Sequence, residues 1–102
     1  MRIITRKRLR EFAPRYTDAA VPLAAWAKVV QAARWRNLDQ VRLVYPHADN
    51  VSVYSGREAT VFNIKGNHYR LITAIHYDRQ RVFVMRFLTH AEYNKDRWKE
   101  SL

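Results

Sequence analysis

The stretch that decides the fold runs from Phe62 to Tyr93 and reads FNIKGNHYRLITAIHYDRQRVFVMRFLTHAEY. Apolar and polar residues alternate in three runs of this stretch, which is the period of a β-strand. The three runs are Phe62–Ile64, Tyr69–Tyr77 and Val82–Phe87. The turn sequences Lys65-Gly66-Asn67 and Asp78-Arg79-Gln80 separate them. Consecutive hairpins of this kind predict an antiparallel meander.

Further strands and helices are expected on the N-terminal side of this stretch. Short β-branched or apolar runs predict strands at Met1–Thr5, Val51–Tyr54 and Glu58–Ile64. Leu38, Val41 and Val44 predict a turn or two of helix before Tyr45-Pro46. A helix capped by Thr5 is expected to run to about Ala13, where Pro14 ends it, with Leu9, Phe12 and Ala13 buried. The alanine-rich segment Asp18–Trp35 predicts the longest helix, with Leu23, Trp26, Ala27 and Val30 on its buried face.

Together these elements predict an α+β fold: a small antiparallel β-sheet with two N-terminal helices packed on one face and a short C-terminal helix. With 102 residues the chain is too short for two hydrophobic cores, so we expect a single domain over residues 1–102. A hydrophobic content of 48% is enough for a packed core and argues against disorder.

The composition also narrows the chemistry. The absence of cysteine excludes disulfides, a thiolate zinc site and a cysteine nucleophile, and the four histidines lack metal-binding spacing. We therefore predict no cofactor and no metal. No apolar run reaches the ~20 residues of a membrane span, and the basic N-terminus lacks the apolar core of a signal peptide. We expect a cytoplasmic protein that does not bind membranes.

Positive charge is the most informative global property. Nineteen Lys and Arg against nine Asp and Glu give a formal net charge of +10. Such an excess on a small domain favours polyanionic partners, and arginine suits bidentate phosphate recognition. Nucleic acid is therefore the leading class of partner.

The end of the last strand carries a helix start with candidate functional side chains. Thr89 and Glu92 have the spacing of a capping box, which explains Glu92 structurally rather than as a catalytic carboxylate. The box fixes the first helical turn, so His90 and Tyr93, three residues apart, are expected to project from the same side.

Two arginines in the adjacent strands extend this group. If the hairpin between their strands has an even register, Arg70 and Arg86 lie on one face of the sheet as diagonal neighbours. Two such cations repel each other unless an anion lies between them; the alternative is that both point to solvent. Lys65 and His68 flank the turn at the same end of the sheet.

Cations, imidazoles and a phenol in one groove suit cleavage of RNA without a metal. The ribose 2′-OH attacks the adjacent phosphorus, a base takes its proton, an acid protonates the departing 5′-oxygen, and cations stabilise the phosphorane. An imidazole, which ordinarily titrates near ~6.5, can serve either proton role. DNA lacks the 2′-OH, so this chemistry selects RNA.

Two motifs resemble a known family. FNIKGNHYRLI, which begins at Phe62, and THAEY, which begins at Thr89, are similar to HigB-type toxins of bacterial type II toxin–antitoxin systems, within the RelE-like mRNA interferase superfamily. The resemblance extends over roughly residues 1–95 and includes MRIIT and VYPHADNV. It implies an endoribonuclease that cleaves mRNA, usually on the ribosome, and so inhibits translation and growth.

The resemblance also implies partners and a site. The expected partners are mRNA, the ribosome and a HigA-type helix-turn-helix antitoxin, through which the complex binds operator DNA. Asn67 and Arg70 match the first motif, and His90, Glu92 and Tyr93 match the second. We predict that Arg70 and Arg86 hold the phosphate, that His90 or Tyr93 moves protons, and that Lys65 assists electrostatically. RNA contacts are predicted at Asn67, His68, Arg6, Lys7, Arg79 and Arg81.

Two other functions account for the charge. A non-catalytic nucleic-acid-binding module explains the net charge and the aromatic residues without requiring that His90 and Tyr93 converge. A protein-interaction domain with a basic face for an acidic partner is the second alternative.

Overall fold

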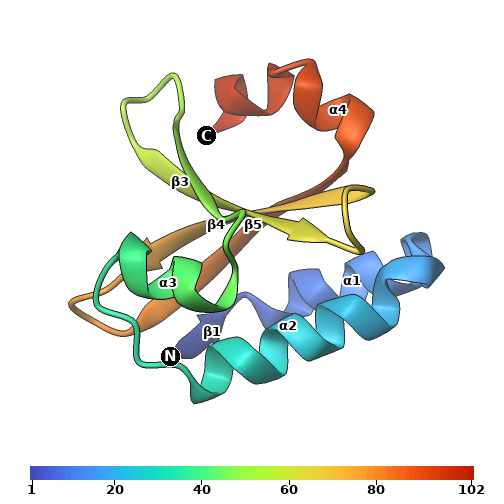
Figure 1. The fold of residues 1–102 in the computed structure, drawn as a ribbon. Helices are drawn as coiled ribbons and strands as arrows, with labels where there is room; N and C mark the ends of the chain where they lie inside the picture. The colour runs from blue at the N-terminus through green and yellow to red at the C-terminus, as the bar shows by residue number, and fades with distance from the viewer.

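The computed structural model describes all residues from 1 to 102 and shows one sheet between two layers of helices (Figure 1). The strands are β1 (Arg2–Ile4), β2 (Asp49–Ser52), β3 (Glu58–Ile64), β4 (Tyr69–His76) and β5 (Arg81–Thr89). The helices are α1 (Arg6–Arg15), α2 (Ala20–Ala32), α3 (Leu38–Val44) and α4 (His90–Asn94), with short 3₁₀ turns η1 (Thr17–Ala19) and η2 (Arg97–Ser101).

The sheet has the strand order β1-β5-β4-β3-β2. The expected antiparallel meander is confirmed for β2 to β5, whose neighbours all pair antiparallel. The edge strand β1 differs, because it pairs parallel with β5. Hairpins force antiparallel pairing, but β1 reaches β5 only through the rest of the chain, so no turn sets its direction.

The main core lies between the sheet and the N-terminal helices. Leu23, Trp26 and Val30 are buried on α2, as expected, and pack with the side chains of Phe62 and Leu71 from β3 and β4. Figure 1 shows α1 and α2 side by side beneath the sheet. The short helix α3 adds Val41 to the same core. None of these helices is long and apolar enough to cross a membrane.

The C-terminal segment covers the opposite face of the sheet (Figure 1). Trp98 from η2 is only 6% exposed and packs with Val61 and Ile72 in a second, smaller cluster. No packing role was predicted from the sequence for the segment after Tyr93. The sheet is therefore a middle layer, and α4 lies over the start of β4 and the end of β5.

Two details of the first helix differ from expectation. Thr5 does not cap it: the Thr5 backbone has a left-handed φ of 68°, and its side chain makes no capping bond. Its hydroxyl oxygen instead accepts from the Val84 N–H at 3.0 Å. The prediction that Pro14 ends the helix was also wrong, because α1 continues to Arg15 with Pro14 in its last turn.

A β-bulge interrupts the pairing of β4 with β5. From the connecting loop the pairing is regular as far as Thr73 with Val84. The following pair is Ile72 with Arg86, which leaves Met85 as an extra residue. Without this insertion Arg86 would lie opposite Leu71 and face the helix-covered core. A one-residue shift reverses which face a side chain takes, so the bulge turns Arg86 to the face of Arg70.

The bulge is held from the edge of β5 by the start of α1. The Arg8 guanidinium donates to the carbonyl oxygens of Val84 at 3.1 Å and Met85 at 3.0 Å. The Thr5 hydroxyl donates to the same Val84 carbonyl at 3.0 Å. The pairing of β1 with β5 ends at Ile4 and Phe83, and these side-chain bonds serve the next carbonyl groups of β5.

We expect Arg8→Met to weaken the bulge, because two carbonyl groups lose a charged donor. The expected loss of unfolding free energy is about 1.5 kcal/mol, measured by urea denaturation. Amide hydrogen exchange at Met85 and Arg86 should accelerate. Arg10→Met is the matched control, since Arg10 is exposed on the same helix and makes no side-chain hydrogen bond. Equal stability of the two variants would contradict the role given to Arg8.

Candidate active site

The candidate site forms where the β3–β4 turn meets the start of α4. Tyr69 pairs with Thr89, and the next residue continues the ladder, because the His90 N–H donates to the His68 carbonyl at 3.0 Å. Residues 65–68 form the turn, in which Lys65 and Gly66 both have positive φ. Backbone hydrogen bonds thus join the β3–β4 turn to the start of α4, although the two segments are far apart in the chain.

Arg70 is the centre of the site and is only 9% exposed. Its Nη2 donates to the Asn67 side-chain oxygen at 2.5 Å, and its Nη1 donates to the carbonyl oxygens of Asn67 at 3.3 Å and Tyr69 at 3.1 Å. Nη2 also lies 3.0 Å from Nδ1 of His90. The rigid fork of guanidinium donors is therefore held in one orientation with its charge unpaired by any carboxylate.

The contact with Arg70 constrains which tautomer of His90 can make this bond. A guanidinium has no acceptor, so Nδ1 of His90 must accept the bond with its lone pair. The imidazole proton is then on Nε2, which lies 3.1 Å from the side-chain amide of Asn94. The atom of Asn94 at that distance is Nδ2, so a proton on Nε2 requires a 180° rotation of the Asn94 amide that brings its oxygen there as the acceptor.

The capping box is present as the sequence predicts. The Glu92 N–H donates to the Thr89 hydroxyl at 3.2 Å, and the Thr89 N–H donates to the Glu92 carboxylate at 3.0 Å. The expectation that His90 and Tyr93 project from one side is also confirmed, because both meet Arg70. The Arg70 guanidinium carbon lies 5.7 Å from the centre of the Tyr93 ring, a cation–π distance.

Tyr93 also packs against Trp98, a residue for which no role was predicted from the sequence. The two rings stack with centroids 5.3 Å apart, and the indole N–H of Trp98 donates to the Tyr93 carbonyl at 3.1 Å. Tyr93 therefore contacts both Arg70 and Trp98 through its ring. A tryptophan in an otherwise polar tail was the available signal.

Burial raises the pKa of the Tyr93 phenol above its ordinary value, although the charges of Lys99 and Arg70 oppose that shift. The phenol therefore remains protonated at neutral pH and can donate a hydrogen bond. It is poorly suited to accept a proton as a base.

A raised pKa in the folded state predicts a dependence on alkaline pH. The native protein holds the Tyr93 proton more tightly than the unfolded chain, so this contribution to stability is present below about pH 10 and is lost above it. We expect the Tyr93→Phe variant to lose less stability than the parent between neutral and strongly alkaline pH. Urea denaturation across that range measures the difference, and identical pH dependence would contradict it.

Arg86 lies on the same face as Arg70, which confirms the predicted placement. Arg70 pairs with Leu88 and Ile72 pairs with Arg86, so the two arginines are diagonal neighbours. They do not share a partner: Arg86 donates to the Met85 carbonyl at 2.9 Å and to the Ser101 hydroxyl at 3.3 Å. Separate hydrogen bonds direct the two guanidinium groups to different partners.

Lys65 contacts the opposite layer. Its ammonium nitrogen lies 2.9 Å from an Asp18 carboxylate oxygen, and the Tyr69 hydroxyl donates to the other oxygen at 2.5 Å. The Tyr69 hydrogen bond and then Lys65 lower the pKa of Asp18, and Asp18 in turn raises the pKa of Tyr69. Asp18 thus ties the turn to η1, and Lys65 makes no bond to Arg70 or His90.

The other predicted RNA contacts are dispersed. His68 is exposed in the turn beside the site, with its ring Nδ1 2.9 Å from the Lys65 carbonyl. Arg6 and Lys7 are exposed on α1. Arg79 and Arg81 lie at the far end of β4 and β5. No three His, Asp or Glu side chains gather into a group that could hold a metal ion.

Comparison with known proteins shows the family of this chain. Residues 19–96 match the family model of the HigB toxin, described as the RelE-like toxic component of a toxin–antitoxin system. The chain is 26% identical to the mRNA interferase toxin HigB of Escherichia coli K12, over 92% of this chain and 88% of that protein. It is 28% identical to an mRNA interferase HigB of Escherichia coli O6:H1, over 93% and 90% of the two chains. The chain therefore belongs to the HigB family of RelE-like toxins.

Proposed function

We propose that this protein is an mRNA interferase, an endoribonuclease toxin that stops growth by cleaving mRNA. The observation that carries the proposal is the buried Arg70 guanidinium, held by Asn67 and in contact with both His90 and Tyr93. A preorganised cation beside a proton-transfer group is what cleavage through the ribose 2′-OH requires. The printed names of the relatives, mRNA interferase, support the same activity.

In the proposed reaction the 2′-oxygen attacks the adjacent phosphorus while its proton passes to a base. The bond from phosphorus to the 5′-oxygen then breaks, which leaves a 2′,3′-cyclic phosphate and a protonated 5′-hydroxyl. Arg70 binds the non-bridging phosphate oxygens and stabilises the extra charge of the phosphorane. Its existing bonds to Asn67 hold it in place, so little reorganisation is needed.

The contact between Arg70 and His90 supports a coupled role for the histidine. In the free protein the Nδ1 lone pair of His90 accepts from Arg70, so it cannot accept a substrate proton at that position. A phosphate that takes over the Nη2 donor releases this lone pair. We propose that His90 then accepts the proton of the 2′-OH and returns it to the 5′-oxygen.

Tyr93 is proposed to donate a hydrogen bond to the reacting phosphate, since its raised pKa keeps the phenol protonated. Arg86 is proposed to hold the RNA backbone further along the same face. Asn67 and His68 would contact RNA next to the scissile phosphate. Lys65 is proposed to assist by shaping the turn through Asp18 and by adding positive charge.

The proposed partners follow from membership of the toxin family. A toxin of this kind acts on translated mRNA in the cytoplasm, so we propose that it binds the ribosome. Its inhibitor is proposed to be a HigA-type helix-turn-helix antitoxin, and operator DNA would be bound through that antitoxin in the complex.

The test is to induce the protein in bacteria and map the ends of mRNA. A reporter message is expressed in two forms, one translated and one with its start codon removed. Cuts in both forms that require His90 support RNA cleavage, and cuts only in the translated form also support action on the ribosome. If the purified protein binds RNA but never cleaves it, with or without ribosomes, the binding-module function is correct instead.

A further inference from the structure

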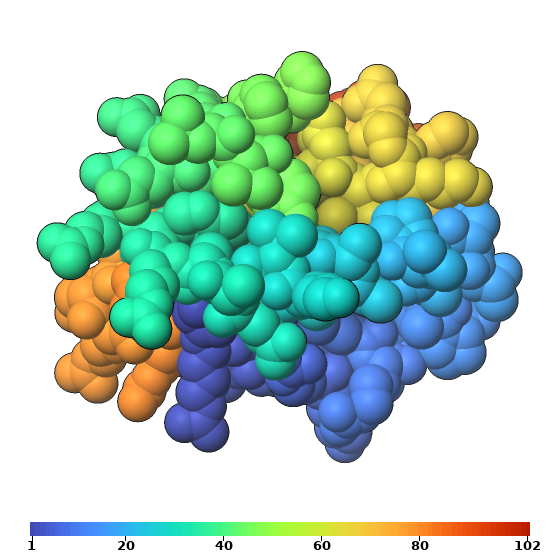
Figure 2. All heavy atoms as spheres, turned by 60° about the horizontal axis from the view of Figure 1, so that its bottom comes forward, coloured from blue at the N-terminus to red at the C-terminus, as the bar shows by residue number.

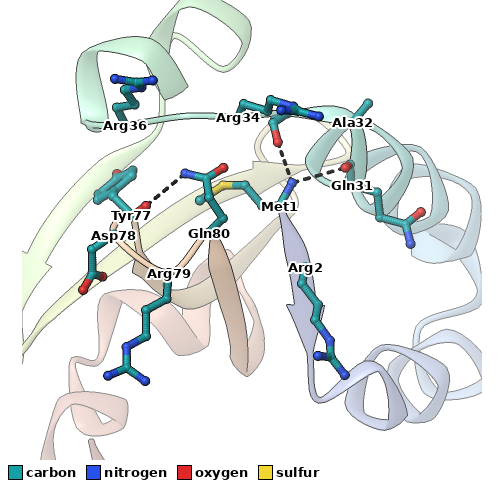
Figure 3. A pocket seen from close by; sticks show the side chains of 11 residues that line it. Met1, Arg2, Gln31, Ala32, Arg34, Arg36, Tyr77, Asp78, Arg79 and Gln80 are labelled. Atoms are coloured by element: carbon teal, nitrogen blue, oxygen red, sulfur yellow. Dashed lines mark hydrogen bonds between the residues drawn. The ribbon is translucent and has the colours of Figure 1, made fainter.

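A groove lies at the end of the sheet opposite the candidate active site. It is lined by Arg2, Arg34, Arg36 and Arg79, together with Met1 and the β4–β5 loop. Figure 2 shows the loop, in orange, beside the N-terminal segment, in dark blue, with the residues that follow α2, in teal, on a third side. Figure 3 shows the four arginine side chains around this hollow.

The arginines of this groove differ from those of the candidate active site in their bonding. Arg70 and Arg86 each donate side-chain hydrogen bonds to the protein. In contrast, none of the four groove guanidinium groups makes a hydrogen bond or an ion pair. The only acidic residue in the lining is Asp78. Four unpaired cations around one hollow favour an anionic ligand.

Arg34 follows the C-terminus of α2, but it is not needed there to stabilise the end of the helix. Cations near a helix C-terminus often serve the terminal carbonyl groups and the helix dipole. Here the Met1 ammonium already donates to the carbonyl oxygens at the end of α2, those of Val30 at 3.1 Å, Gln31 at 3.2 Å and Ala33 at 2.5 Å. Figure 3 shows Met1 beside Gln31 at this helix end. The guanidinium of Arg34 is therefore left for another partner.

The groove is separate from the candidate active site. Arg70 and Tyr77 lie seven residues apart at the two ends of β4, which corresponds to about 23 Å at ~3.3 Å per strand residue. In the parallel ladder Arg2 also pairs with Arg81, which extends the positive charge along the sheet edge. A ligand in the groove would not touch Arg70 directly.

We propose that this groove binds the sugar–phosphate backbone of RNA away from the cleaved bond. This inference rests on the proposed RNA-cleaving function. RNA is favoured over an acidic protein because protein interfaces depend on buried aromatic or aliphatic anchors. The large exposed hydrophobic residues are Val21, Val29, Leu43, Val44 and Tyr54. None of them lines the groove.

The test compares two variants with the same change in charge, both made with His90→Ala so that RNA is not consumed. The groove variant carries Arg34→Gln, Arg36→Gln and Arg79→Gln. The control variant carries Arg10→Gln, Lys28→Gln and Arg57→Gln, which alter exposed residues without side-chain hydrogen bonds or ion pairs. Thermal unfolding checks that both remain folded.

Binding of a short fluorescently labelled single-stranded RNA is measured by anisotropy over a range of salt. Loss of three phosphate contacts should reduce the slope of log K against log salt by about 2 in the groove variant, with a smaller change in the control. Equal slopes in the two variants would overturn the proposal. A second contrary result concerns polyglutamate, a model of an acidic protein. If its binding depends on the groove arginines as strongly as RNA binding does, the groove is not an RNA site and the proposal is overturned.

A second measurement separates this inference from the proposed function. With His90 intact, the groove variant should cleave saturating RNA with an unchanged kcat and a raised KM. Absence of cleavage by the parent protein would refute the proposed function, while the comparison of RNA binding would still decide whether the groove is an RNA site.

Discussion

Replacing His90 by alanine is expected to lower the rate of RNA cleavage by about 10²–10⁴-fold, the range for loss of a positioned proton-transfer group. The imidazole contacts Arg70 through Nδ1 and Asn94 through Nε2, so it is held beside the proposed phosphate position. Its removal leaves Arg70 bonded to Asn67 and Tyr69. RNA binding should therefore change little, and the loss should be in kcat, measured by single-turnover cleavage.

The matched control is His47→Ala. His47 is exposed in the loop after α3, and no hydrogen bond involves its ring. This variant should cleave RNA and arrest growth like the parent. If His90→Ala retains cleavage within a few-fold of the parent, His90 is not the proton-transfer group and the proposed mechanism is wrong.

Replacing Arg70 by lysine is expected to lower kcat by about 10²–10³-fold, although the charge is conserved. The planar fork of arginine reaches the Asn67 side chain, two carbonyl groups and His90 at the same time. An ammonium group is a single point of charge on a flexible stem and cannot reproduce that fork. Loss with conserved charge would show that geometry, rather than positive charge alone, stabilises the phosphorane.

Arg70 is buried, so its replacement also tests the fold. Thermal unfolding and RNA anisotropy should be measured on the same sample, and only a folded variant that binds RNA is informative for kcat. Arg42→Lys serves as the control, because Arg42 is an exposed arginine of α3 in an ion pair with Asp49. Full activity of a folded Arg70→Lys variant would remove Arg70 from the proposed mechanism. The double variant with His90→Ala should lose little more than the worse single variant if the two side chains act as a unit.

Local sequence rules were sufficient for the elements themselves. The alternation in Phe62–Phe87 predicted β3, β4 and β5, and the spacing of Thr89 and Glu92 predicted the capping box and with it the common side of His90 and Tyr93. Such features depend on neighbours within a few residues, whose geometry is nearly the same in any fold. Thr5 and Pro14 show the limit of these rules, because a bond to Val84 outweighed the usual cap at Thr5.

The composition of the candidate site depended on contacts across the chain. Pairing from the β4–β5 loop alone would turn Arg86 into the core, and the extra residue Met85, held by Thr5 and Arg8, moves it to the face of Arg70. Trp98 supports Tyr93 only because the C-terminal segment folds back over the sheet.

The same distinction applies to the cations. The net charge of +10 predicted a polyanionic partner from composition alone. Tertiary packing then paired Lys65 with Asp18, bonded Arg70 and Arg86 to the protein, and left the four groove arginines unpaired. Residue type and spacing therefore determined the strands, the helix cap and the charge. The sheet face that Arg86 takes and the partners of the cations depend on contacts between residues up to about 80 positions apart, which no local pattern encodes.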